Sequence, residues 1–241
     1  MTRELWILIP SAFAASTLSG VIGMGGGVLL LAVMASVLAP PLVVPLHGVV
    51  QLTSNSTRTL TLLRRVDWMI VLFYCPTLVL GVFLGLQLYR GTEMVWFRPL
   101  IGWFVLAFLA WDRFRPRRLQ IPRWAFVPAG LVGGVITILI GASGPYLASL
   151  FLRDDMDKES IIATKAMVQT VGHLLKIPAF LSIQFDYTGN LRLLLPLLAC
   201  AIGGTLAGTW VLTKMGERAF RVIFRVVLLG LALRLVLDPF L

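Results

Sequence analysis

The chain has 241 residues, of which 58% are hydrophobic and only 13% are charged, and its mean hydropathy is +0.90. Apolar runs follow one another along the whole length and leave no room for a soluble domain. The formal net charge of +10 therefore indicates cytoplasmic loops and lipid headgroups and not nucleic acid. Cys75 and Cys200 stand singly in apolar runs, which favours core packing over redox or metal chemistry. Because only helices satisfy their backbone across lipid in such runs, we predict an all-α polytopic membrane protein.

The first apolar run, residues 5–38, is too long for one membrane span of about 20 residues and too short for two. Its centre reads IGMGGGVLLLAVM, although each glycine inside a helix costs about 1 kcal/mol relative to alanine. We therefore predict a re-entrant hairpin over residues 4–38 that turns at residues 23–27 and returns to the same side. The opening MTRELWILIP belongs to this element and is not interpreted as a cleaved signal.

The remaining apolar runs predict a second hairpin and six single spans. The first repeat covers residues 1–112, a cytoplasmic basic linker covers 113–123, and the second repeat covers 124–241, beginning with a hairpin over 124–152. The predicted spans are 42–63, 69–89 and 96–112 in the first repeat, and 160–183, 190–212 and 218–238 in the second.

An internal repeat is indicated by glycine motifs and rare polar residues that match between the two halves at offsets of 118 to 123. GMGGG at 23–27 matches GASGP at 141–145 at an offset of 118, and GVFLG at 81–85 matches GTLAG at 204–208 at 123. The first offset also pairs His47 with Lys165, Gln51 with Gln169, Asn55 with His173 and Arg58 with Lys176. A hairpin plus three spans is an odd number of crossings, so the two repeats are predicted to be inverted. The glycines of GVFLG and GTLAG are interpreted as sites of close helix packing.

The distribution of basic residues agrees better with hairpins than with eight simple spans. With the four basic residues inside spans set aside, the hairpin topology places twelve on one face and five on the other, whereas eight spans give ten and seven. Positive residues prefer the cytoplasm. The linker 113–123 is therefore predicted to be cytoplasmic and both termini periplasmic.

Two predicted helices carry polar residues at spacings of three and four, which places them on one face of each helix. No acidic residue on either face pairs with the cations, and ionisable residues at membrane depth are costly without a partner. An anion is the predicted partner, although snorkelling cations and helix-linking glutamines are the structural alternative. Glycine tips would offer backbone N–H groups to an oxyanion. The predicted substrate-binding residues are Gly25, Gly26, Gly27, Gln51, Asn55, Arg58, Ser143, Gly144, Lys165, Gln169, His173 and Lys176.

The motifs SGVIGMGGGVLLL and PLHGVVQLTSNSTR, with GASGPYLASLFL and ATKAMVQTVGHLLK in the second half, resemble the sulfite exporter TauE/SafE family, also called the toluene-sulfonate uptake permease family. The resemblance covers nearly the whole chain. It implies an inner-membrane transporter of sulfite, organosulfonates or similar sulfur-containing anions.

We therefore expect a secondary transporter that works by alternating access, and not an enzyme. The alternative is a rhomboid-like intramembrane serine protease with Ser143 as nucleophile and His173 as base. Candidate partners are the sulfur anion, the lipid bilayer, a second copy in a homodimer, and protons as a coupling ion acting through His47 or His173. No cofactor, metal or nucleic acid is expected.

Overall fold

The computed structural model describes residues 2–22, 25–114, 121–151, 155–211 and 217–237. Gly23 of the first predicted tip and residues 115–120 of the predicted linker lie outside this part of the chain. Ten α-helices and no strand occur in the described residues, which confirms the all-helical prediction. The helices are α1 (Thr2–Ile22), α2 (Gly26–Val37), α3 (Pro40–Thr61), α4 (Trp68–Gly91), α5 (Phe97–Phe114), α6 (Phe126–Leu139), α7 (Gly144–Leu150), α8 (Lys158–Leu181), α9 (Leu191–Val211) and α10 (Glu217–Leu237).

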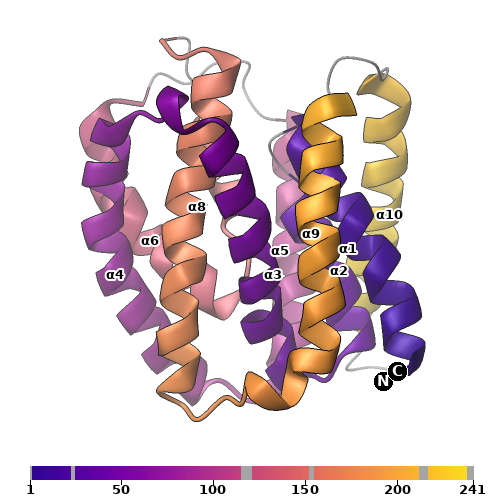
Figure 1. Ribbon diagram of the computed structural model, residues 1–241. Helices are drawn as coiled ribbons and strands as arrows, with labels where there is room; N and C mark the ends of the chain where they lie inside the picture. Colours follow the sequence, from indigo (N-terminus) through magenta and orange to yellow (C-terminus); the bar gives the residue numbers. More distant parts are fainter. Residues whose placement is uncertain (1, 23–24, 115–120, 152–154, 212–216, 238–241) are drawn as a thin grey trace.

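The helices pack in pairs, each of which joins one helix from the first half of the chain to one from the second half (Figure 1). The most extensive contacts are those of α4 with α6 and of α1 with α9, followed by α3 with α8 and α5 with α10. In Figure 1, α3 and α8 lie between the α4–α6 pair on the left and the α9, α1 and α10 group on the right. Helix α1 begins and α10 ends at the same end of the molecule.

The pairing has a symmetry that follows the repeat offsets. If α1 to α5 are matched in order with α6 to α10, the α4–α6 contact becomes the α9–α1 contact, and α3–α8 becomes itself. The contacts of α3 with α9 and of α4 with α8 exchange in the same way. Each half therefore packs its first helix on the fourth helix of the other half.

Helices α3 and α8 run antiparallel at the centre. Near the start of α8, Arg65 pairs with Asp157 at 3.3 Å, and Thr59 lies 3.3 Å from Thr170 further along the two helices. The starts of the two helices are built differently. Pro40 suits the first turn of α3 because proline has no N–H to leave unpaired, whereas the Asp157 carboxylate caps α8 by accepting from the Ser160 N–H at 2.7 Å.

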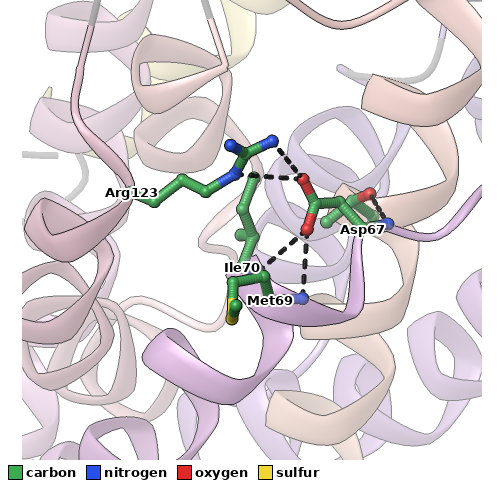
Figure 2. A network of polar contacts seen from close by, with 5 residues as sticks. Asp67, Met69, Ile70 and Arg123 are labelled. Carbon is green, nitrogen blue, oxygen red and sulfur yellow. Dashed lines mark hydrogen bonds and ion pairs between the residues drawn. The ribbon is translucent and has the colours of Figure 1, made fainter.

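Asp67 joins three segments at the end of the molecule where α8 begins (Figure 2). Its carboxylate caps α4 by accepting from the backbone N–H groups of Met69 and Ile70, at 3.0 and 3.3 Å. Arg123, just before α6, donates to the other carboxylate oxygen from Nε and Nη2, at 3.3 and 3.0 Å. The Asp67 N–H donates to Thr164 of α8 at 2.8 Å. The start of the second half is thereby fixed to the first half.

Glycines bring the paired helices into backbone contact. A Cβ on Gly81 of α4 would collide with the Leu131 carbonyl of α6, and one on Gly208 of α9 with the Thr17 carbonyl of α1. Neither collision is relieved by a side-chain rotation, because the obstacle is backbone. The interpretation of these repeat-related glycines as sites of close helix packing is confirmed.

The distribution of polarity is inside out. Apolar side chains such as Leu72, Phe83, Trp103 and Leu195 are more than half exposed. The charged groups of Arg58 on α3 and of Lys165 and Lys176 on α8 are buried. Two helical segments in the described part, Trp68–Gly91 and Thr188–Trp210, are long and apolar enough to cross a membrane. An apolar exterior around a polar centre is the arrangement expected where lipid is the outer solvent.

Candidate functional site

Each described glycine at the break between α1 and α2 has a different structural role. Gly25 precedes α2 with a φ of 92°, a conformation that favours glycine. Gly26 packs α2 onto α1, since a Cβ there would collide with the Ala15 carbonyl. Gly27 lies against the Gln51 side chain, with its hypothetical Cβ 3.1 Å from Oε1. Glycine at the first tip thus serves the turn at Gly25 and the close packing at Gly26 and Gly27.

The break between α6 and α7 also contains a left-handed glycine. Gly141 has a φ of 99°, and its carbonyl accepts a hydrogen bond from the Lys176 Nζ at 2.6 Å. The ammonium of Lys176 therefore caps the carboxyl end of α6, where the helix dipole favours a cation. Gly144 begins α7 and lies against Gln169, with its hypothetical Cβ 3.3 Å from Nε2. Each tip therefore places a glycine over a glutamine of the following long helix.

The buried face of α3 is organised by hydrogen bonds along the helix. His47 donates from Nε2 to the Gly27 carbonyl at 2.8 Å, which holds α3 to the first tip. Asn55 donates from Nδ2 to the backbone oxygen of Gln51 at 2.9 Å, and its Oδ1 accepts from Arg58 Nη1 at 3.4 Å. Arg58 is 2% exposed, and its Nε and Nη2 have no hydrogen-bond partner in the described protein. Two buried donors on one guanidinium therefore remain to be satisfied.

The facing side of α8 supplies Gln169 and His173. The rings of His47 and His173 lie edge to face with their centroids 6.0 Å apart, so the two helices approach closely here. His173 is 1% exposed, and its Nδ1 has no hydrogen-bond partner among the described residues. Polar groups of both halves meet at this point.

A small cavity lies where the two tips meet α3 and α8. The cavity volume is about 20 Å³, enough for about one ordered water. None of the described lining residues is acidic, and Arg58 is the only one with a fixed charge. The lining residues are Ser19, Gly25, Gly27, Val28, His47, Gln51, Asn55, Arg58, Ala142, Gly144, Gln169 and His173.

Most of the predicted substrate-binding residues meet at this cavity, and four do not line it. Gly26 contacts α1, and Lys176 is directed to the Gly141 carbonyl. Ser143 and Lys165 are buried at 3% and 4% exposure but are absent from the described lining. The protease alternative needs Ser143 beside His173, and only the histidine lines the cavity.

Sequence reasoning missed Ser19, Val28 and Ala142, which also line the cavity. Ser19 carried a weak signal, since it is a polar residue four positions before the glycine cluster. Val28 and Ala142 carried no such signal, because in the sequence an apolar residue that lines a cavity looks the same as one that packs in the core.

The described lining of the cavity carries one cation, several neutral polar groups and no acidic side chain. Its polar groups include the guanidinium of Arg58, side-chain amides, imidazoles and the backbone at the start of α2, whose first N–H groups have no partner within the helix. Among the described residues, no group of three His, Cys, Asp or Glu side chains comes together as metal ligands would. Donors without a compensating carboxylate favour a negatively charged ligand.

In the comparison with protein families, residues 8–235 match the family described as Sulfite exporter TauE/SafE. No curated protein and no solved structure matches the chain. The matched segment contains all of the described residues that line the cavity.

Proposed function

The chain belongs to the sulfite exporter TauE/SafE family, and from this premise we propose that it is a secondary transporter of a small sulfur-containing anion, such as sulfite or an organosulfonate. Membership of the family suggests a membrane transporter for sulfite or a related sulfur anion. The substrate is held in the cavity between the two tips, where Gln51, Asn55, Gln169 and His173 offer hydrogen bonds.

One observation carries the proposal most directly. Arg58 is buried beside the cavity with Nε and Nη2 unpartnered in the described protein, and no acidic residue of the described lining faces it. Leaving such donors unsatisfied costs more than an average hydrogen bond gains, and the cost is larger for charged groups. An oxyanion supplies both the negative charge and the acceptor atoms that this guanidinium needs.

We propose that residues 1–112 and 124–241 are inverted repeats, each consisting of a re-entrant hairpin and three spans. The exchange symmetry of the helix contacts supports this arrangement, as does the antiparallel packing of α3 on α8. Helices broken near the membrane centre and paired around a site are typical of alternating-access transporters. The breaks after α1 and after α6 are the proposed tips.

In this topology the linker 113–123 is cytoplasmic and both termini are periplasmic, because basic residues favour the cytoplasmic side of an inner membrane. Export of the anion is then driven by the membrane potential, by about 2.3 kcal/mol per unit charge per 100 mV. Import needs a coupled cation, for which protons acting through His47 or His173 are the proposed choice.

Flux through proteoliposomes tests the proposal. The purified chain should move sulfite or a short sulfonate, and Gln169→Ala and His173→Ala should each lower the flux about tenfold or more, since each removes a buried hydrogen bond to a charged ligand. Gln87→Ala is the matched control, because this glutamine is exposed on α4. Wild-type flux in both site variants would refute the site, and no flux of any sulfur anion in the wild type would refute the function.

A further inference from the structure

The two sides of the cavity differ in polarity. One side faces the end of the molecule where α8 begins and α9 ends, at the top of Figure 1, and the other faces the end where α3 begins and α8 ends. We call these the upper and the lower end. Under the proposed inverted repeat, each residue on one side of the cavity corresponds to a residue on the other side, so the two sides can be compared position by position.

Hydroxyl groups lie between the cavity and the upper end. Thr59, which follows Arg58 of the cavity lining on α3, has its hydroxyl 3.3 Å from that of Thr170 on α8. The hydroxyls of Ser54 on α3 and Thr205 on α9 are joined by a hydrogen bond of 2.9 Å, and both residues are 0% exposed. A pair of hydroxyls joined by one hydrogen bond retains a second O–H donor, which can turn toward an anion or its water.

Apolar side chains fill the corresponding place on the lower side. Val82 and Tyr89 of α4, Phe97 of α5 and Phe180 of α8 belong to one buried cluster. The rings of Tyr89 and Phe180 lie edge to face with centroids 5.1 Å apart, and the Phe97 ring lies 4.5 Å from that of Tyr89. Phe180 follows His173 of the cavity lining by seven residues, which is about two helical turns toward the lower end. The cluster therefore closes α4, α5 and α8 together below the cavity.

The repeat shows that this difference is one of polarity at matched positions. Three pairs related by the offsets of 123 and 118 are, with the upper residue first, Thr205 and Val82, Ser54 and Gly172, and Thr59 and Ile177. The hydroxyl pair of the upper side thus has no equivalent on the lower side. Threonine and valine have nearly the same shape but differ by a hydroxyl group, so space alone does not explain the exchange at 205 and 82.

Resting on the proposed transport function, we infer that the anion reaches the cavity from the upper end along the hydroxyl-lined path between α3, α8 and α9, and that the cluster around Val82, Tyr89 and Phe180 is a hydrophobic gate on the lower side. Hydroxyls can replace part of the hydration of an anion, whereas an apolar constriction excludes water and ions until its side chains separate. The two sides therefore present unequal barriers, and the lower barrier limits the flux. In the proposed topology the upper end is cytoplasmic.

Cysteine labelling tests the path without requiring transport. Thr205→Cys and Val82→Cys occupy matched positions and change side-chain size little, and both are made in a full chain whose Cys75 and Cys200 are replaced by alanine. In nanodiscs, where both ends meet solvent, a negatively charged methanethiosulfonate should modify Thr205→Cys about tenfold or more faster than Val82→Cys. Complete modification of both cysteines after unfolding is the control.

Equal labelling rates, or faster labelling at position 82, overturn the inference whether or not the protein moves an anion. Faster labelling at position 205 in a chain that moves no sulfur anion supports the path and refutes the transport function. The two failures are thereby distinguished.

Val82→Thr tests the gate, because it places in the lower side the hydroxyl that the upper side has at Thr205. The sulfite flux through proteoliposomes should rise about twofold or more, since a polar group lowers the cost of hydrating the constriction. Val79→Thr is the matched control, because this valine is exposed on the same helix. Thermal unfolding checks that each variant keeps its fold. Wild-type or lower flux in a folded Val82→Thr protein refutes the gate.

Discussion

Arg58 on α3 and Lys176 on α8 are related by the repeat offset, yet they end in different surroundings. Both are buried, at 2% and 0% exposure. Arg58 lines the cavity with two donors unpartnered in the described protein, whereas Lys176 donates to the Gly141 carbonyl and does not line it. The two cations at matching repeat positions thus differ in place: one lines the cavity in the first half, and the other caps a helix in the second.

The difference teaches that sequence symmetry does not fix how two equivalent charges are used. Lysine is a compact point charge that fits a single carbonyl at a helix end, while arginine offers a fork that fits an oxyanion. With arginine at position 58 and lysine at the matching position 176, we expect the first cation to serve binding and the second to serve stability. Each prediction below tests whether this division of roles holds.

Removing Arg58 should have the largest effect on the anion. Arg58→Ala deletes two charge-assisted hydrogen bonds, each worth about 1.5–3 kcal/mol, so the affinity for a sulfonate should fall about a hundredfold or more. Calorimetric titration measures the affinity. The protein should remain folded, because the deleted donors Nε and Nη2 have no protein partner in the described chain. Arg90→Ala, on an exposed arginine of α4, is the control, and comparable losses in both variants would break the comparison.

The glycines related to one another at the two tips should differ in their effect on folding. In Gly26→Ala the new Cβ meets the Ala15 carbonyl, which is backbone, so the free energy of unfolding should fall by about 2–3 kcal/mol. In Gly144→Ala the Cβ meets only the end of the Gln169 side chain, at 3.3 Å, which can move. Unfolding in mixed micelles measures both variants. Equal destabilisation would show that the two tips pack alike.

The fold class and the polar faces could be predicted because they depend on local pattern. Spacings of three and four place Gln51, Asn55 and Arg58 on one face, whatever the packing around them. The role of Lys176 could not be predicted, because it depends on where the Gly141 carbonyl points after a left-handed turn. Ser19 reaches the cavity only through the packing of α2 on α1, which the pattern of α1 does not contain.

Replacing Lys176 should affect stability and lower binding much less than replacing Arg58 does. Lys176→Met keeps the apolar stem but leaves the Gly141 carbonyl unpaired, a loss of about 1–2 kcal/mol in the free energy of unfolding. The affinity for a sulfonate should fall much less than in Arg58→Ala, since the ammonium does not line the cavity and only a through-space attraction is lost. Thermal unfolding and calorimetric titration measure the two quantities. A loss of affinity as large as that of Arg58→Ala would return Lys176 to the binding site.

The starts of α3 and α8 should also differ in how they respond to pH. This is the smallest of the predicted effects. The Ser160 N–H, together with the nearby charge of Arg65, holds the pKa of Asp157 below its usual value. Its carboxylate thus stabilises the folded state above the unfolded pKa of about 3.9, and this contribution is lost as pH falls through the lower folded pKa. Asp157→Asn keeps a cap without a titrating group. Its thermal midpoint should therefore fall less than that of the wild type between pH 7 and pH 3. Since α3 starts at Pro40 with no acidic cap, an equal fall in both proteins would place the acid sensitivity elsewhere than at the start of α8.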